Sequence, residues 1–475
     1  MVLGIDVGTS SVKCLLVGDA GEVVGTGAAE YPLHTPNPGW AEQDPEDWWR
    51  ATLEAVRRAR AGHDFGSVAA IGVSGQMHTL VLLDAEARPV RPAIAWPDAR
   101  TTREVETFHA RVPRDAQVSI LGNPPATGFT GPSLMWVRNH ERDAYRRGAR
   151  FVLPKDHLRY RLTGTVATDA SDASATLLFD VPRRRWAEEV IAALELSPDL
   201  LPPVIGSGEV AGGLTREAAD ALGLPAGIPV VAGAGDQAAA AIGCGLVDPG
   251  TMLVTMGSGG QVFAPLRTPT PDPELRVHLF CHAVKDRWHL LGAVQNVGLA
   301  LSWIRSLLGW TWERLVSEAE NVPPGADGLL FLPYLTGERT PHMDPAARGT
   351  LWGLTLAHGP AHLARAAIEG VTFAIHDAIA ACLDVGAAAD TLVVAGGGAR
   401  NAFRRQLLAD VVNRPLYLAD VEDASAKGAA VLAGAPMPTL SPTLVAEPGA
   451  ASERYREVAG RYRRLYRAVR GGFEG

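Results

Sequence analysis

The stretch Gly4-Ile5-Asp6-Val7-Gly8-Thr9-Ser10-Ser11-Val12-Lys13 decides how the chain begins to fold. Apolar residues over 2–7 and 12–17 predict two strands, and the glycine and hydroxyl residues between them predict a tight turn. Asp6 then stands near the end of a strand, beside a turn whose backbone amides can surround phosphate oxygens. Taken alone, this motif is explained better by an ordinary hairpin turn.

A second strand–turn–strand motif repeats this pattern in the C-terminal half. Apolar residues over 251–256 and 261–264 flank the turn Gly257-Ser258-Gly259-Gly260. Two such hairpins in one chain favour a nucleotide held by two related domains. We therefore expect an N-terminal domain over residues 1–245 and a C-terminal domain over residues 246–475.

The segments between these motifs alternate between strand and helix patterns. Asp44-Pro45 predicts a helix start, with an N-cap followed by proline at the first helical position. A strand is expected at 68–73, a long core helix from about Ala361, and a final amphipathic helix around 455–469. Residues 436–448 are expected to form a loop. The alternation predicts an α/β fold with mixed sheets.

Composition excludes several classes of protein. The chain has 475 residues, 47% of them hydrophobic and 20% charged, and a formal net charge of −8. These values are typical of a globular protein and argue against disorder, coiled coil and general nucleic-acid binding. The start of the sequence lacks the pattern of a secretory signal, and its 4 cysteines have no metal-site spacing. We expect a cytoplasmic protein with no nucleic-acid or membrane partner.

Asp236 is the carboxylate that stands out most. It follows an expected strand at 230–232 and the turn Gly233-Ala234-Gly235, in almost wholly apolar surroundings. Aspartate here is either a helix N-cap or a general base, and the neighbouring glycines, which let a ligand approach, favour the base. Because 230–247 carries Asp236 and Gln237, we do not expect it to span a membrane.

The same glycines allow one rival interpretation. Gly233-x-Gly235-x-x-Ala238 after a strand also fits a dinucleotide-binding fingerprint, which indicates an NAD-dependent oxidoreductase. That fingerprint requires an acidic residue at the end of the next strand, but the expected strand at 253–256 ends in Gly257-Ser258. The oxidoreductase is therefore the weaker alternative.

Two further groups of residues complete the candidate site. Gly396-Gly397-Gly398-Ala399-Arg400-Asn401 follows an expected strand and suits a close backbone approach to an adenosine, although a tight packing turn explains it as well. Gly75-Gln76-Met77-His78 is a polar spot at a strand end, as are Trp96-Pro97-Asp98 and Lys155-Asp156-His157. The sequence contains no P-loop motif.

In combination, these motifs resemble the FGGY carbohydrate kinases, most closely the xylulokinase branch of bacteria. The resemblance runs from residue 1 to about residue 434. It rests on seven ordered segments: GIDVGTSSVK at 4–13, GWAEQDPEDWW at 39–49, GQMH at 75–78, LPKDHLRYRLTG at 153–164, AGAGDQ at 232–237, FLPYLTGERTPH at 331–342 and GGGARN at 396–401. Residues 349–369 also fit the second signature of the family at each defined position.

The resemblance implies two actin/hexokinase-like (ribonuclease H-like) domains with mixed sheets around an interdomain cleft. It implies transfer of a phosphoryl group from ATP to a ketopentose, giving D-xylulose 5-phosphate, with Asp236 as the catalytic base and Mg²⁺ near Asp6. The sugar-contacting residues would be Met77, His78, Asp236 and Gln237. The ATP-binding residues would be Gly8, Thr9, Ser10, Gly257, Ser258, Gly259, Gly397, Gly398 and Asn401.

Three positions depart from the family pattern. Ser133 replaces a usual lysine, Ser258 a common threonine, and Gln237 an asparagine found in many xylulokinases. Because Gln237 lies where the sugar would bind, another ketose or a polyol, such as ribulose, remains an alternative substrate. The sequence also leaves open whether two copies form a homodimer.

Overall fold

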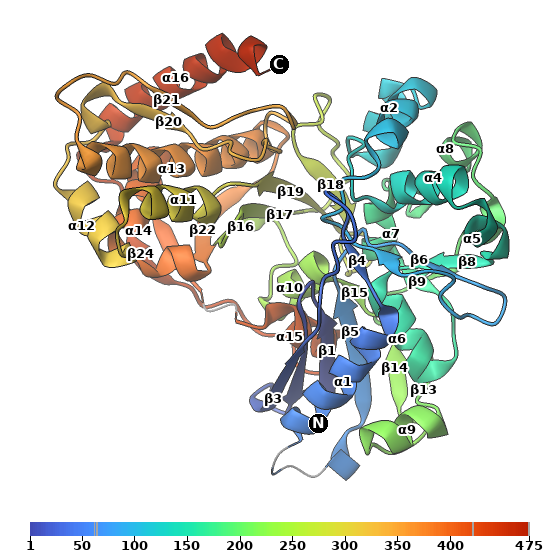
Figure 1. Ribbon diagram of the computed structural model, residues 1–475. Coiled ribbons are helices and arrows are strands. Elements are labelled where there is room, and N and C mark those ends of the chain that lie inside the picture. Colours follow the sequence, from blue (N-terminus) through green and yellow to red (C-terminus); the bar gives the residue numbers. More distant parts are fainter. Residues whose placement is uncertain (61, 63–64, 420–421, 474–475) are drawn as a thin grey trace. The chain divides into compact units, whose positions relative to one another are not determined.

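The computed structural model describes residues 1–60, 62, 65–419 and 422–473, in two compact units (Figure 1). Unit 1 consists of Met1–Val247, Leu279–Trp288 and Asp423–Leu440. Unit 2 consists of Asp248–His278, His289–Glu422 and Ser441–Gly475. Two short segments from the second half of the chain therefore complete unit 1.

A mixed sheet in the order β13-β14-β5-β1-β2-β3 forms the framework of unit 1. β1 pairs with β2 antiparallel and with β5 parallel, and β15 pairs with β5 in parallel too. The strand bounds are β1 Val2–Val7, β2 Ser11–Val17, β3 Val23–Glu30, β5 Ala70–Gly75, β13 Val210–Gly213, β14 Pro229–Val231 and β15 Ala234–Gly235. The first hairpin predicted from the sequence is confirmed.

Helices cover both faces of this sheet. Successive side chains of a strand point to opposite faces, so Val12, Cys14 and Leu16 of β2 join the core that contains α1 residues. Leu15 and Val17 pack instead against α15. The covering helices are α1 Pro45–Ala59, α6 Pro154–Thr163, α10 Asp236–Gly243 and α15 Ala424–Leu432.

Two local features fix these helices. The side chain of Asp44 accepts a hydrogen bond from the backbone N–H of Glu46, and Pro45 is the first residue of α1, as the sequence predicts. Gly72 of β5 lets α15 approach closely, because a Cβ at Gly72 would stand 1.7 Å from the backbone oxygen of Ala429. Any larger residue at this position would force the helix away from the sheet.

The rest of unit 1 packs around a second apolar core formed mainly by residues 80–201. Its helices are α2 Thr102–Arg111, α4 Thr130–His140, α5 Arg142–Arg147, α7 Ala170–Ala173 and α8 Glu188–Ala193, with α9 Arg216–Leu222 beside the main sheet's core. Short strand pairs link them: β4 Glu42–Gln43 with β7 Ala93–Ile94, and β6 Val81–Leu83 with β8 Arg150–Val152. Ser133 lies fully buried in α4.

Unit 2 repeats the strand arrangement of unit 1. β16 pairs with β17 antiparallel and with β22 parallel, as β1 pairs with β2 and β5. The strands in order are β19 Trp288–Val294, β17 Gly260–Leu266, β16 Gly250–Met256, β22 Ala389–Ala395, β23 Leu416–Leu418 and β24 Thr443–Ala446. Its longer helices are α11 Gly298–Leu308, α12 Trp312–Glu320, α13 Pro360–Asp384, α14 Ala402–Val412 and α16 Ser452–Val469. The predicted repeat of the hairpin is confirmed.

One loop prediction is wrong. Residues 443–446, expected within a loop, form β24 and pair antiparallel with β23. Thr443 and Leu444 are exposed, so no alternation of buried residues marks this strand in the sequence. The pairing with β23, a contact between distant parts of the sequence, decides its conformation.

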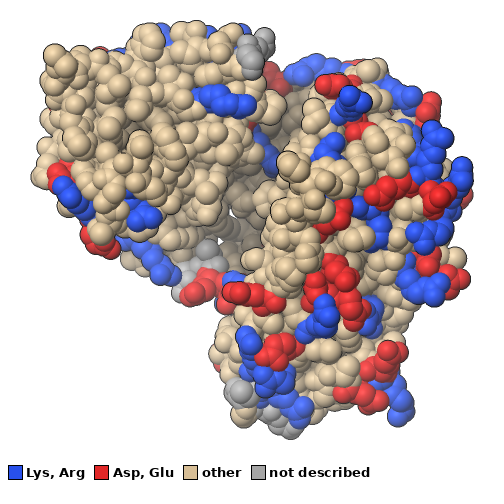
Figure 2. Space-filling view, in the orientation of Figure 1, with Lys and Arg blue, Asp and Glu red and all other residues tan. Residues whose placement is uncertain are grey.

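Among the described residues, α13 is the one helix long and apolar enough to cross a membrane. In its most apolar window 83% of the residues are buried inside the protein, as in a core helix. The apolar segment 230–247 forms β14, β15 and α10 instead. Figure 2 shows acidic and basic side chains interspersed over the visible face of unit 1 and few on that of unit 2.

Candidate active site

Asp6 lies near the end of β1, where the chain turns into β2. It is 9% exposed and accepts a 2.8 Å hydrogen bond from Ser74 Oγ of β5. Burial raises the pKa of the Asp6 carboxyl to about 6, against the opposing effects of Ser74 and Lys13. The ammonium of Lys13 lies 2.7 Å from the carboxylate of Asp423, directly before α15.

The turn Gly8-Thr9-Ser10 is held by side chains from distant segments. Trp96 Nε1 donates to Thr9 Oγ1 at 2.8 Å, and Gln43 Nε2 donates to the backbone oxygen of Thr9 at 2.7 Å. The hydroxyl of Tyr31 donates to the backbone oxygen of Gly8. Because Thr9 Oγ1 accepts from Trp96, its own hydroxyl hydrogen remains available to donate to a ligand.

The Met77-His78 segment follows β5 directly. His78 has a φ of 70°, a strained value for a residue other than glycine. Its Nδ1 lies 2.7 Å from the backbone oxygen of Ala175, and its own backbone oxygen accepts from Thr130 Oγ1 at 2.7 Å. Since a carbonyl only accepts, Nδ1 carries a proton and donates to Ala175.

Asp236 is the first residue of α10, and Gly235 is the N-cap. The N-cap alternative for Asp236 is therefore wrong. The residue is half-buried. Burial, and next the charge of Asp6, raise the pKa of the Asp236 carboxyl to about 7, while hydrogen bonds from Gln237 oppose the rise. A carboxyl group with this pKa can accept a proton near neutral pH.

The sheet register brings Asp6 and Asp236 to the same edge. Ser74 of β5 pairs with Asp6 of β1 on one side and with Ala234 of β15 on the other. All three strands are parallel, so their carboxyl ends meet, which is where ligands bind in open α/β sheets. The structure thus brings together carboxylates that stand 230 positions apart in the numbering (236 − 6).

These carboxylates suit a magnesium ion bound together with phosphate. Mg²⁺ in phosphoryl-transfer sites takes one or two protein carboxylates, and water and phosphate oxygens complete its coordination. Burial raises the pKa of Asp6, and burial together with the charge of Asp6 raises the pKa of Asp236. A divalent cation bound nearby would favour the ionised form of both carboxylates. Within residues 1–60, 62, 65–419 and 422–473, no group of three or more His, Cys, Asp or Glu forms an all-protein cage.

A fully buried cluster of charged side chains lies next to Asp236 and is connected by hydrogen bonds to the preceding residue, Gly235. Lys155 Nζ contacts three carboxylates, Asp156 at 2.6 Å, Asp169 at 3.1 Å and Asp172 at 3.4 Å. Ser171 Oγ donates to Asp169 at 2.6 Å and accepts from the N–H of Gly235 at 3.1 Å. The polar cluster at Lys155-Asp156, undecided from the sequence, is therefore structural support next to the site.

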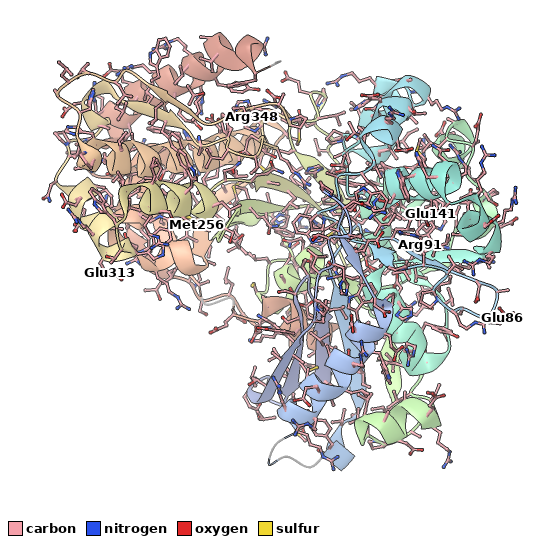
Figure 3. All side chains as sticks on the ribbon, viewed as in Figure 1. Glu86, Arg91, Glu141, Met256, Glu313 and Arg348 are labelled. Atoms are coloured by element: carbon pink, nitrogen blue, oxygen red, sulfur yellow. The ribbon has the colours of Figure 1, made fainter. Side chains whose placement is uncertain are left out.

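In unit 2, the expected ATP-binding residues surround a cavity of about 820 Å³. Gly257, Ser258, Gly397, Gly398 and Asn401 line it, whereas Gly259 does not belong to the lining. Figure 3 labels Met256, at the end of β16, and Glu313, on α12, which both line the cavity. The remaining lining residues are Gly298, Leu299, Leu301, Ser302, Trp312, Leu315, Val316, Ser317, Glu320, Ile368 and Arg404.

The two glycine-rich turns are fixed differently. The carbonyls of Gly257 and Ser258 accept from backbone N–H groups at the start of α11, at 3.0 to 3.1 Å. Asn401 caps α14, because its side-chain oxygen accepts from the N–H of Arg404 at 3.0 Å. Apolar walls from α11, α12 and α13 complete a pocket that can take a flat aromatic base next to the two glycine-rich turns.

Sequence reasoning missed Gln43, Ser74, Asp423 and Arg404. Gln43 stands inside the quoted segment 39–49, and Ser74 directly follows the predicted strand at 68–73. A polar residue within or next to a buried strand is a usable signal for a structural or site role. Asp423 and Arg404 have no such signal, because only the folded chain places them beside the other groups.

Comparisons with known proteins agree with this arrangement. The N-terminal domain of the FGGY family of carbohydrate kinases matches residues 1–243, and the C-terminal domain of that family matches residues 252–437. The chain is 42% identical to a xylulose kinase of Escherichia coli, with 91% of this chain and 89% of that protein covered. It is 38% identical to a Bacillus subtilis xylulose kinase, with 91% and 87% covered.

A solved structure agrees as well. The crystal structure described as a xyloylose kinase from Brucella ovis superposes with a TM-score of 0.93 at 38% identity and covers 99% of each chain. The expected two-domain actin/hexokinase-like fold is confirmed, and the oxidoreductase alternative is not favoured. The chain belongs to the FGGY family of carbohydrate kinases and is an ATP-dependent sugar kinase.

Proposed function

We propose that this kinase phosphorylates D-xylulose with ATP, giving D-xylulose 5-phosphate and ADP. The observation that carries the proposal is the pair Asp6 and Asp236 at one edge of the unit 1 sheet, in a chain 42% identical to a xylulose kinase. The pair supplies one carboxylate for a metal ion and one for a proton. Phosphoryl transfer needs these groups together with precise alignment of the reactants.

In this proposal, Met77, His78, Asp236 and Gln237 bind the sugar. Asp236 accepts the proton of the attacking hydroxyl as the new O–P bond forms, while the bond between the γ-phosphorus and the leaving oxygen of ADP breaks. His78, oriented by the hydrogen bond from Nδ1 to Ala175, contacts a second hydroxyl of the sugar. The strained backbone of His78 fits a residue whose position is fixed by function.

The residues proposed for ATP fall into two groups. Gly257, Ser258, Gly259, Gly397, Gly398 and Asn401 hold the nucleotide in unit 2, and Gly8, Thr9 and Ser10 bind the phosphoryl group that is transferred. The hydroxyl of Thr9 accepts from Trp96 and donates its own hydrogen to a phosphate oxygen, which can only accept. Asp6 would hold Mg²⁺ through its carboxylate, and the bound metal would supply positive charge to neutralise the phosphates.

An ADP-release assay on a panel of acceptors tests the proposal. D-Xylulose should give the highest kcat/KM among D-xylulose, D- and L-ribulose, glycerol and gluconate. Failure on D-xylulose with rapid turnover of another sugar would reassign the substrate, since Gln237 stands where it can touch the acceptor. We also propose that the enzyme works in the cytoplasm. Its oligomeric state is a separate question, and size-exclusion chromatography with light scattering will show whether two copies form a homodimer.

A further inference from the structure

Arg404 occupies an unusual position in unit 2. It is the third residue of α14 and lines the 820 Å³ cavity together with Gly398 and Asn401. A Cβ built on Gly398 would stand 2.8 Å from Arg404 Nη1, so the guanidinium lies directly against the glycine-rich turn. No motif in the sequence singles out this arginine.

The charge of Arg404 lacks a protein partner. Burial lowers the pKa of its guanidinium to about 10. In the part of the chain that the structure describes, no carboxylate lies within ion-pair distance of it. Two other arginines of unit 2 do have one: Arg365 contacts Glu369 at 2.7 Å, and Arg463 contacts Asp377 at 2.6 Å.

Besides burial, the position of Arg404 on α14 is a second factor that disfavours its positive charge. The N-terminal end of α14 carries a partial positive charge, so a cation in the first turn is repelled. The neighbouring Arg405 avoids this cost by donating to the backbone oxygens of Ala399 and Arg400 at 2.8 Å. For the Arg404 side chain the structure gives no such bond. A desolvated cation at a positive helix end is a group that an anion would stabilise.

The cavity walls show which anion fits. Leu315 and Ile368 provide apolar surface for a base, whereas the backbone of Gly397 and Gly398 offers close approach to a more polar group. Glu313 and Glu320, the acidic residues of the lining, are exposed on α12. Arg404 is the positively charged residue among those that line the cavity, and its guanidinium lies beside Gly398 of the glycine-rich turn.

We propose that Arg404 binds the phosphate groups shared by ADP and ATP and is a determinant of nucleotide affinity. This inference rests on the proposed ATP site and adds a charged contact to its glycine-rich turns. Arginine presents several N–H donors in a planar fork, which suits bidentate contact with phosphate oxygens. Arg404 thus contributes binding energy to the nucleotide and plays no part in accepting the sugar proton.

Calorimetric titration of the full-length chain with ADP and with adenosine tests this role. R404M should weaken ADP binding about 10- to 100-fold, as expected for loss of a charged hydrogen-bond pair, and leave adenosine binding unchanged. R404K retains the positive charge but not the planar fork of N–H donors, so its affinity for ADP should lie between those of the wild type and R404M. Because R404M removes a desolvated, dipole-opposed cation, its Tm without nucleotide should equal or exceed that of the wild type.

R314M is the matched control. Arg314 lies on α12 of the same unit, is exposed, and pairs with Glu318 at 3.4 Å outside the cavity lining. This variant should bind ADP like the wild type. Equal losses of ADP and adenosine binding in R404M would overturn the phosphate contact, and so would unchanged ADP binding. A wild-type chain that binds no ADP would instead overturn the proposed ATP site itself.

Discussion

Gln43 and Gln76 share a buried hydrogen bond, in which Nε2 of Gln76 donates to Oε1 of Gln43 at 2.7 Å. The other end of the Gln43 amide donates to the backbone oxygen of Thr9 at 2.7 Å. One fully buried side chain thus joins the turn after β1 to the segment that leads into Met77 and His78. The proposed phosphate and sugar contacts are therefore mechanically linked within unit 1.

We predict that Q43L impairs both contacts. Leucine fills a similar volume but leaves the Thr9 carbonyl and the Gln76 amide without this partner, at a cost of about 1–3 kcal/mol for a buried polar group. The free energy of unfolding should fall by that amount in urea titrations. Steady-state kinetics should show a raised KM for both D-xylulose and ATP.

A double-mutant cycle isolates the Gln43–Gln76 bond. If the bond matters, Q43L/Q76L will be less destabilised than the sum of Q43L and Q76L, since the second substitution removes a group that already lacks its partner. Additive effects on stability and KM would contradict the link.

For Asp236, D236N is expected to abolish most activity. Asparagine keeps the shape of the side chain but cannot accept the sugar proton, and general-base catalysis contributes about 10²–10⁴-fold. An ADP-release assay should show a fall in kcat of that size with an unchanged circular dichroism spectrum. D220N, at an exposed carboxylate of α9, is the matched control and should keep wild-type turnover. Near-normal kcat in D236N would remove Asp236 from its proposed role.

The same variant has a predictable pH dependence of stability. The pKa of Asp236 is raised from 3.8 to about 7 in the folded protein, so the folded state favours the protonated carboxyl. The wild type therefore loses stability as the pH rises from about 4 to about 7, because ionisation of this group is easier in the unfolded chain. D236N has no carboxyl group at this position, so this loss of stability with rising pH should be absent from the variant.

Differential scanning calorimetry without nucleotide or magnesium measures the effect. The Tm of D236N minus that of the wild type should increase between pH 4 and pH 7 and level off above it. A difference that stays constant over this range would show that Asp236 ionises equally easily in the folded and unfolded chain.

A substitution at Gly397 can fill the proposed nucleotide cavity without disturbing the fold. A Cβ at this position meets no atom within 4 Å, and the glycine does not have a positive φ. G397V should therefore fold normally, while its methyl groups occupy space that the nucleotide needs. We expect the KM for ATP to rise about tenfold or more, equivalent to about 1.4 kcal/mol, with Tm close to that of the wild type.

G471V is the control for the added side chain. Gly471 also has open space around its Cβ and no positive φ, but it lies outside the cavity lining. Its KM for ATP should match the wild type. A normal KM in G397V would place the nucleotide elsewhere than this pocket.

Features that depend on near neighbours in the chain can be predicted from the sequence. The strands β1, β2, β16 and β17 follow from apolar runs around glycine-rich turns, and the start of α1 follows from Asp44-Pro45. These signals are local, since strand pattern, turn and cap each involve only a few consecutive residues. Ordered motifs were also enough to identify the family.

The polar groups that contact one another, in contrast, depend on how distant segments of the chain pack. Ser74 contacts Asp6 across 68 positions of sequence because β1 and β5 pair in one parallel register. β24 forms because it pairs with β23, and the guanidinium of Arg404 lies next to Gly398 because α14 packs against the glycine-rich turn. Register and burial depend on the packing of distant segments, so no local pattern could specify these contacts or the pKa shifts that follow from them.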